Sequence, residues 1–243
     1  MSVVLREVTR VRASEIGPDG SMRLPALLDL FQEAAGNSAT DLGWASDALL
    51  AQGKTWILSR FHLELRALPV WREEIAVETW PSGVHRVFAL REFRASRADG
   101  TLLAKATSAW LLVAVPSKKP LRPPQEIAAA AAGAPPRVID DAFAPLEPPV
   151  PGAAEGPRTR IGRFDLDLNA HANNVAIFRA LLEGLESAPP PFALEAEFRG
   201  EAFEGDVLVP RSDASGGARR VAVHRASDGR EIARAMMHPT QVS

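Results

Sequence analysis

The stretch RASRADGTLLAKA, Arg94 to Ala106, recurs in shortened form as RASDGREIARA, Arg225 to Ala235. Each copy places an Asp-Gly pair between two runs that have the composition of β-strands. Because glycine tolerates the positive φ of a tight turn, an Asp-Gly pair in this setting predicts a β-hairpin. The sequence therefore predicts two related hairpins, one in each half of the chain.

The segments that precede the hairpins match in the same order. PVWREEIAVE (69–78) parallels EAFEGDVLVP (201–210), since each has an aromatic residue, then charged or small residues, then an alternating β-branched run. Agreement over several consecutive segments predicts that the chain contains one structural unit twice.

Each half also contains a run of apolar residues at helical spacing, with a suitable residue at its start. Pro25 suits the first turn of the first helix, and Asn173 or Asn174 is available to cap the second. The apolar positions are Leu24, Leu27, Leu28, Phe31, Ala34 and Ala35 in the first half, and Phe178, Leu181, Leu182 and Leu185 in the second.

Period-two alternation predicts strands between these points. Phe61, Leu63 and Leu65 alternate with His62, Glu64 and Arg66, and Phe192, Leu194, Ala196 and Phe198 alternate with Glu195, Glu197 and Arg199. We expect the polar set to face solvent and the apolar set to face a helix. An antiparallel sheet wrapped around one central helix, an α+β fold, satisfies both patterns in each half.

Residues 133–157 hold seven of the twenty prolines and predict a semi-rigid, extended linker. The run before it, Gln125 to Ala132, has high helix propensity and is expected to cap the first unit. The predicted domains are therefore residues 1–132 and 158–243, joined by this linker.

The composition excludes several classes of protein. The 243 residues carry a formal charge of −2, unlike a dedicated nucleic-acid binder, and include no cysteine for a disulfide, a thiolate metal site or a nucleophile. The five histidines are scattered, so we expect no metal and no cofactor. The first twenty residues carry charges throughout, and no stretch approaches the ~18 apolar residues of a membrane span. We expect a cytoplasmic protein.

One segment, RFDLDLNAHANN (163–174), has the residue types of a catalytic site. Asp165, Asp167, Asn169 and His171 alternate with small or apolar residues, so an extended backbone would project all four from one side, next to the free amides of a helix N-terminus. Such a set can orient an imidazole, position a water molecule and stabilise an oxyanion. Aspartate and asparagine before a helix are also common turn and capping residues. The residue types alone leave hydrolysis and a structural role open.

At this segment the sequence resembles the acyl-ACP thioesterases, a double-hotdog family that ends fatty-acid synthesis in plastids and occurs in bacteria. The family pattern D-x-N-x-H-x-N-N matches residues 167–174, and the pattern E-Y-R-R-E-C-G corresponds to residues 197–203. The resemblance extends over roughly residues 5 to 240 and includes TWILSRFHLEL, PVWREEIAVETWPSG, REFRASRADGTLLAKATSAWLLV and KKPLRPPQEI in the first half.

The resemblance implies a tandem hotdog whose two antiparallel sheets each wrap around a central helix. It also implies hydrolysis of the thioester between a fatty acyl chain and the phosphopantetheine arm of acyl carrier protein (ACP). His171 and Asn169 would then engage the thioester carbonyl and the attacking water, Asp167 would hold one of them in place, and Glu201 would act as general base. Ala202 stands where many relatives have cysteine, so a thiol nucleophile is not expected.

Strict alternation from Phe198 places Glu201 on the face predicted to be solvated, with Glu195 and Glu197. A β-bulge at Gly200 would re-aim it toward the site.

The resemblance also suggests where substrate and carrier bind. Phe31 and Trp56 would line the acyl tunnel in the N-terminal hotdog, and Asn174 would contact substrate at the catalytic helix. Because ACP is acidic, basic clusters are candidates for its docking surface: Lys118, Lys119 and Arg122, and Arg158, Arg160 and Arg163. Either cluster could equally be a solvated loop. We expect a monomer or a homodimer.

Two other functions stay open. The chain could hydrolyse acyl-CoA instead of acyl-ACP, or it could be a non-catalytic module that binds acyl chains. A module that only binds has no chemical need for the full set of Asp167, Asn169, His171 and Glu201.

Overall fold

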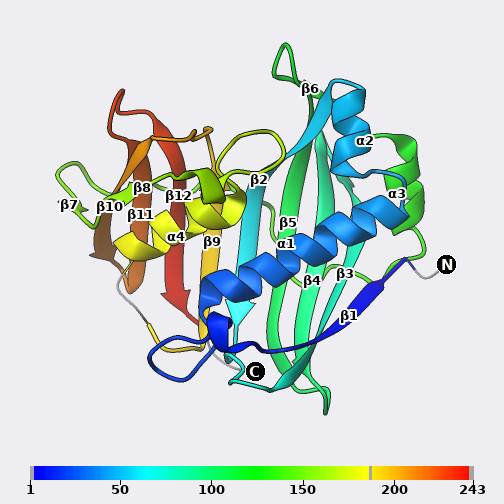
Figure 1. Ribbon diagram of the computed structural model, residues 1–243, viewed down its shortest axis with the longest axis horizontal. Helices are drawn as coiled ribbons and strands as arrows, with labels where there is room; N and C mark the ends of the chain where they lie inside the picture. The colour runs from blue at the N-terminus through cyan, green and yellow to red at the C-terminus, as the bar shows by residue number, and fades with distance from the viewer. Residues whose placement is uncertain (1–2, 186–187, 241–243) are drawn as a thin grey trace. The chain divides into compact units, whose positions relative to one another are not determined.

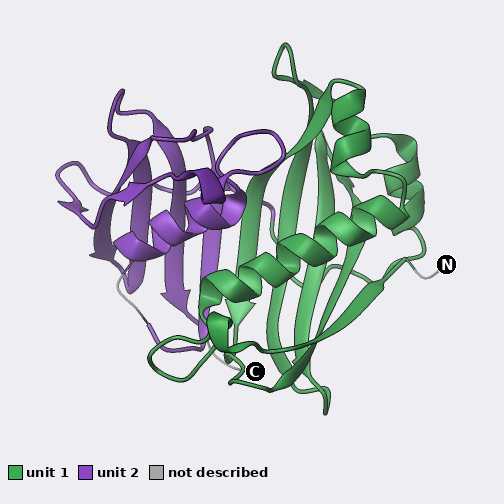
Figure 2. Ribbon diagram, viewed as in Figure 1, with its two compact units in different colours: residues 1–141 green, residues 142–243 purple. Residues whose placement is uncertain are grey.

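The chain divides into two units, residues 1–141 and 142–243 (Figure 2). The structure is a computed structural model that describes residues 3–185 and 188–240. The division falls inside the proline-rich segment 133–157, so that segment contributes residues to both units.

Unit 1 is an antiparallel sheet with one long helix against it (Figure 1). The sheet order is β1-β3-β4-β5-β2, and β6 pairs with the end of β5. The elements are β1 (Leu5–Arg10), η1 (Ala13–Glu15), α1 (Leu24–Asp41), α2 (Ser46–Ala51), β2 (Lys54–Leu65), β3 (Glu74–His85), β4 (Phe88–Arg97), β5 (Leu102–Ala114), β6 (Lys119–Leu121) and α3 (Gln125–Ala131).

Unit 2 repeats this plan with fewer residues (Figure 1). The sheet order is β9-β12-β11-β10, and β7 and β8 both pair with β10. The elements are β7 (Ala154–Glu155), β8 (Thr159–Arg160), η2 (Arg163–Asp165), α4 (Asn174–Gly184), β9 (Phe192–Phe198), β10 (Val207–Ser215), β11 (Ala218–Arg225) and β12 (Glu231–Pro239). Two antiparallel sheets, each with a central helix, confirm the predicted α+β tandem hotdog.

The helix of unit 1 buries the face that its sequence predicts. All six expected apolar positions are buried, together with Ser38, and a proline occupies the first turn. Phe31 stacks on Phe93 of β4 with 5.0 Å between the ring centroids, which joins α1 to the middle of the sheet.

The helix of unit 2 lies unusually close to its sheet. Asn173 is the N-cap, because its side chain accepts a hydrogen bond from the Ala176 amide at 2.7 Å. At the other end, a Cβ on Gly184 would lie 2.6 Å from both Pro210 Cβ and Val221 Cγ2. Only glycine permits this approach of α4 to β10 and β11.

Both Asp-Gly hairpins are present. Gly100, between β4 and β5, and Gly229, between β11 and β12, have positive φ values of 86° and 69°. Their amides donate to the carbonyls of Arg97 and Arg225, respectively. The predicted hairpins are therefore confirmed.

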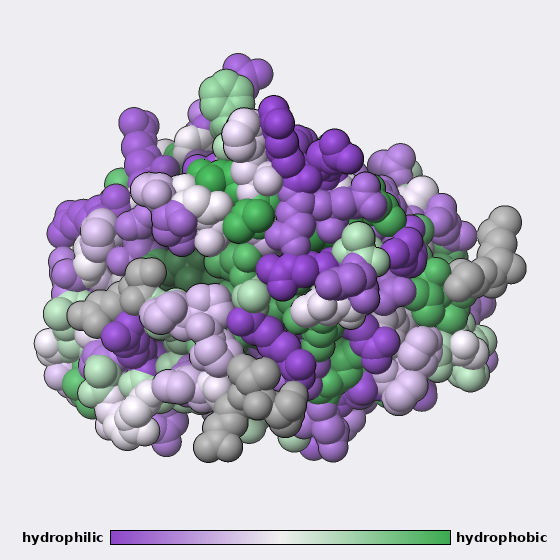
Figure 3. Space-filling model, turned by 90° about the horizontal axis from the view of Figure 1, so that it is seen from below, coloured by the Kyte–Doolittle hydropathy of each residue, from purple (hydrophilic) through white to green (hydrophobic). Residues whose placement is uncertain are grey.

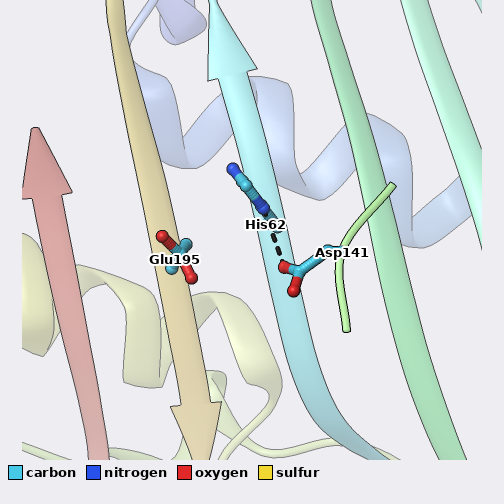
Figure 4. Close-up of side chains that lie close together, drawn as sticks. All are labelled: His62, Asp141 and Glu195. Atoms are coloured by element: carbon cyan, nitrogen blue, oxygen red, sulfur yellow. Dashed lines mark hydrogen bonds and ion pairs between the residues drawn. The ribbon is translucent and has the colours of Figure 1, made fainter. Parts of the chain in front are cut away.

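The polar face of each sheet, which we expected to face solvent, is partly covered. Residues 133–153, which we call the strap, lie over it. In unit 2 Glu197 is only 3% exposed and accepts a hydrogen bond from the Leu146 amide at 3.1 Å, so its predicted exposure to solvent is wrong. In unit 1 the fully buried Glu92 accepts from the Val138 amide in the same way. A contact of 2.8 Å between His62 and Asp141 holds the end of the unit 1 portion (Figure 4).

The outer surface mixes polar and apolar residues, as protein surfaces ordinarily do. Hydrophilic residues interspersed with apolar ones cover the face drawn in Figure 3. Among residues 3–185 and 188–240, no helix is both long and apolar enough to cross a bilayer.

Candidate active site

The segment that precedes α4 forms a tight turn rather than the extended run that the alternation suggested. Leu166 and Ala172 pair as an antiparallel bridge, and the Asp167 amide donates to the His171 carbonyl at 2.8 Å. Ala170 closes the turn with a φ of 58°, a left-handed conformation that alanine rarely adopts. The expectation that an extended backbone projects four side chains from one side is therefore wrong.

The carboxylate of Asp167 organises this turn. One oxygen accepts hydrogen bonds from the amides of Asn169 at 2.8 Å and His171 at 3.2 Å, and the other accepts from the Asn169 side-chain amide at 3.3 Å. Asp167 thus fixes the positions of both residues. Asp165 lies outside this group, since it caps Gly162 and pairs with Arg179 of α4.

Glu201 reaches the turn through a bulge at the end of β9. The amides of Arg199 and Gly200 both donate to the Ile232 carbonyl, at 2.8 and 3.0 Å, which is the two-to-one pattern of a β-bulge. Beyond it, the Ala172 amide donates to the Ala202 carbonyl at 2.8 Å and ties the Asp167 turn to this segment. The bulge that the strand alternation required is present at Gly200.

His171 and Glu201 meet as a result. His171 Nε2 lies 3.8 Å from Glu201 Oε1, and the two side chains are 30% and 28% exposed. This separation is longer than a direct hydrogen bond and short enough for one bound group to contact both side chains. A half-exposed imidazole and carboxylate in this arrangement can exchange protons with a bound reactant.

The sequence prediction missed a third member of this group, Phe203. Its ring centroid lies 5.0 Å from that of His171 at an interplanar angle of 59°, and the residue is 39% exposed. The signal was available, because residues i and i+2 of an extended segment project to the same side. Phe203 follows Glu201 by two.

Unit 1 contains the same turn without the imidazole and without the counterpart of Glu201. There the Gly17 amide donates to the Ser21 carbonyl at 2.8 Å, Ile16 pairs with Met22, and the Met22 amide donates to the Pro69 carbonyl. The residues that correspond to His171 and Glu201 are Ser21 and Leu68, and a carboxylate is still present, because Asp19 accepts from the Ser21 amide at 3.1 Å. The backbone therefore folds this way without His171 and Glu201, which argues against a purely structural role for these two residues in unit 2.

The predicted substrate-binding residues are divided between the units. Phe31 is fully buried against Phe93, and Trp56 is a half-buried residue of β2 that pairs with Leu112; all of these lie in unit 1. Asn174 is the first residue of α4 in unit 2 and is half-buried. The turn and the bulge bring together only the four predicted catalytic residues.

The predicted carrier-docking residues all lie at the surface. Exposed side chains occur at Lys118, Lys119 and Arg122 in unit 1, and at Arg158, Arg160 and Arg163 in unit 2. Arg158 lies 3.6 Å from Glu155, and Arg163 begins the 3-10 turn that leads to the Asp167 turn. The second cluster is thus continuous in sequence with the site.

Known proteins with a similar sequence include plant enzymes. The chain is 26% identical over 203 residues to oleoyl-acyl carrier protein thioesterase 2, chloroplastic, of Arabidopsis thaliana, a match that covers 72% of this chain and 52% of the relative. The chain therefore spans about half the length of that relative.

Two solved structures share the fold over nearly the whole chain. The 12:0-ACP thioesterase from Umbellularia californica has a TM-score of 0.84 at 23% identity and covers 98% of this chain and 97% of its own. An acyl-ACP thioesterase from Bacteroides thetaiotaomicron has a TM-score of 0.82 at 22% identity, with 97% of each chain covered. At these identities the likeness concerns the fold.

The family is shown by the sequence itself. Residues 3–131, more than half of the chain, match the family model described as the acyl-ACP thioesterase N-terminal domain. This match lies in the N-terminal half of the sequence. It confirms the resemblance that the run from Asp167 to Asn174 suggested. This chain belongs to the acyl-ACP thioesterase family.

Proposed function

We propose that this protein hydrolyses the thioester of fatty acyl-ACP to a free fatty acid and ACP, and so terminates chain elongation. The observation that carries the proposal is the 3.8 Å approach of His171 and Glu201 on a turn that unit 1 builds without either group. The family and the names of its members support the same reaction.

The chemistry needs a base, an activated water molecule and a polarised carbonyl. Glu201 would take a proton from water as the water oxygen bonds to the thioester carbonyl carbon, while His171 and Asn169 engage the carbonyl oxygen and the water. The C–S bond then breaks, and the pantetheine sulfur takes up a proton to leave as a thiol. Ala202 and the lack of any cysteine in the sequence leave water as the nucleophile.

The roles of substrate-binding and docking residues belong to the same proposal. Phe31 and Trp56 would contact the acyl chain, and Asn174 would contact substrate near the catalytic turn. The two named relatives accept oleoyl and 12:0 chains, so family membership does not select a chain length. A bacterial cytoplasm, and a monomer or homodimer, stay predictions.

ACP is acidic, and this protein has a net charge of −2, so productive docking requires a locally basic surface. We propose that Arg158, Arg160 and Arg163 serve this purpose, with Lys118, Lys119 and Arg122 as a second contact. Their exposure and their grouping in two short stretches of sequence support it.

One experiment decides between this function and the two alternatives. The purified full chain is incubated with acyl-ACPs of different chain length and with the matching acyl-CoAs, and released fatty acid is measured. We expect a higher kcat/KM on the ACP substrates. A preference for acyl-CoA would favour the CoA thioesterase, and tight binding without release would favour the non-catalytic module. Ser21→Ala in unit 1 serves as the control for His171→Ala in unit 2.

A further inference from the structure

The ring of Phe203 contacts the imidazole of His171, which also approaches Glu201. Glu201 and Phe203 follow one another at i and i+2, and His171 contacts both, with Nε2 3.8 Å from the carboxylate and 5.0 Å between the two ring centroids. A half-exposed histidine with no such neighbour would have several staggered rotamers available. The two side chains together restrict the rotamers of the imidazole.

Hydrogen bonds and a nearby cation fix the backbone of Phe203 and the surroundings of its ring. Its amide donates to Asp206 Oδ2 at 2.9 Å, and the same oxygen accepts from Arg225 Nη1 at 3.2 Å. The Arg225 guanidinium lies 6.0 Å from the Phe203 ring centroid, and Asp228 holds it at 3.1 Å. The ring therefore has a fixed cation and His171 as neighbours.

Unit 1 has the same anchor but lacks the ring. There the Val70 amide donates to Glu73 Oε2 at 2.9 Å, and Arg97 Nε pairs with the other oxygen of Glu73 at 2.5 Å. Val70, which is 52% exposed, pairs with Ser21, the counterpart of His171. The anchor therefore belongs to the fold, whereas the aromatic ring occurs in the unit that has the histidine.

Phe203 is 39% exposed, so its ring contributes little to the core, and a local role at His171 accounts for it better.

We propose that Phe203 is a positioning residue that keeps the imidazole of His171 turned toward Glu201. The inference rests on the proposed function for its catalytic consequence, but its geometric content is independent of the substrate.

The test compares Phe203→Ala with Phe203→Tyr, and uses Val70→Ala as the matched control in unit 1. We expect Phe203→Ala to lower kcat by about 10-fold with KM little changed, because misplacement of a reacting group affects the chemical step. Phe203→Tyr should retain parental kcat, and Val70→Ala should change neither constant. Thermal unfolding of all three should match the parent, since both positions are exposed.

A second readout does not depend on hydrolysis. The χ1 rotamer of His171 is followed by NMR through its side-chain scalar couplings, with His171→Ala used to assign the signal. We expect Phe203→Ala to spread the imidazole over several rotamers and Phe203→Tyr to restore one. Unchanged couplings in Phe203→Ala would overturn the positioning role. An active His171→Ala variant would instead overturn the proposed function and leave this readout to decide the inference.

Discussion

His171 in unit 2 and Ser21 in unit 1 occupy the same place in two copies of one turn. In each copy the carbonyl of this residue accepts a hydrogen bond at 2.8 Å, from Asp167 in unit 2 and from Gly17 in unit 1. One backbone therefore carries an imidazole in one unit and a hydroxyl in the other, which makes unit 1 a built-in control for the chemistry of unit 2.

The first prediction uses this control. His171→Ser gives unit 2 the residue of unit 1, and we expect it to fold normally while hydrolysis of acyl-ACP falls by about 10²–10⁴-fold, the usual contribution of a proton-transfer group. Glu201→Gln should lose activity on the same scale. Steady-state kinetics measures both, with Ser21→Ala as control. Full activity in either unit 2 variant would refute the assignment.

The second prediction concerns Asp167. Asp167→Gly introduces the residue of unit 1, where Asp19 supplies the carboxylate of the turn instead. In unit 2 the counterpart of Asp19 is Asn169, so Asn169 and His171 lose the carboxylate that holds them. We expect kcat to fall and thermal unfolding to change little. Asp167→Asn keeps one acceptor oxygen and should retain more activity than Asp167→Gly. Equal activity of the two variants would show that the Asp167 carboxylate does not position Asn169 and His171 for catalysis.

Local patterns were sufficient to predict most of the fold. The spacing of apolar residues predicts α1 and α4, and the Asp-Gly pairs predict both hairpins, because each depends on residues close together in sequence. Local patterns did not predict the register of the repeat, that is, which residue of one half corresponds to which residue of the other. Hydrogen bonds align Val70 with Phe203, whereas the sequence comparison had aligned Trp71 with Phe203, one residue away.

The predictions failed where the outcome depends on residues far away in sequence, or on a backbone conformation that the residue type does not indicate. Glu197 reads as solvent-facing from alternation, yet the strap supplies the Leu146 amide as its partner from 51 positions away in sequence. The turn at Asp167 was read as extended, because nothing in the sequence marks Ala170 as left-handed. Glu201 could be placed only with the bulge, and Phe203 only with the position of His171.

The third prediction tests the close approach of α4 to its sheet. Gly184→Ala would place a Cβ 2.6 Å from Pro210 and Val221, so the helix must shift. We expect a loss of about 1–3 kcal/mol in the free energy of unfolding. Gly36→Ala is the matched control, since a Cβ there meets nothing within 4 Å and α1 should gain about 0.5–1 kcal/mol. Chemical denaturation measures both, and equal effects would contradict the packing argument.

The fourth prediction concerns pH and the strap. Hydrogen bonds from Arg220, opposed by burial and assisted by the Val150 amide, hold the pKa of Asp213 below its ordinary value of 3.8. The native carboxyl thus binds its proton less readily than the unfolded one. This contribution to stability is present above about pH 4 and is lost as pH falls through the native pKa.

Asp213→Asn should therefore destabilise the protein at neutral pH and lose less stability than the parent on acidification. Urea unfolding at several pH values measures the difference. Asp140→Asn is the control, because that side chain is fully exposed. If the Asp213→Asn and parent curves run parallel down to pH 3, the carboxyl does not contribute in this way.

The fifth prediction identifies the surface that meets the carrier. If docking depends on opposite charges, kcat/KM on acyl-ACP should fall steeply with added salt, because exposed charges are screened within about 10 Å at 0.1 M. The rate on a short pantetheine thioester, which lacks the acidic carrier, should stay flat. A flat profile on both substrates would contradict electrostatic docking.

Charge reversal then separates the two basic clusters. Arg160→Glu lies in the segment that leads into the catalytic turn, and Lys119→Glu lies beside the turn between β5 and β6 of unit 1. Both side chains are exposed, so neither change should alter folding. We expect Arg160→Glu to raise KM for acyl-ACP several-fold with kcat unchanged, because reversal repels the carrier without touching His171 or Glu201. A larger effect of Lys119→Glu would move the principal contact to unit 1, and the short thioester reports any unintended damage to the site.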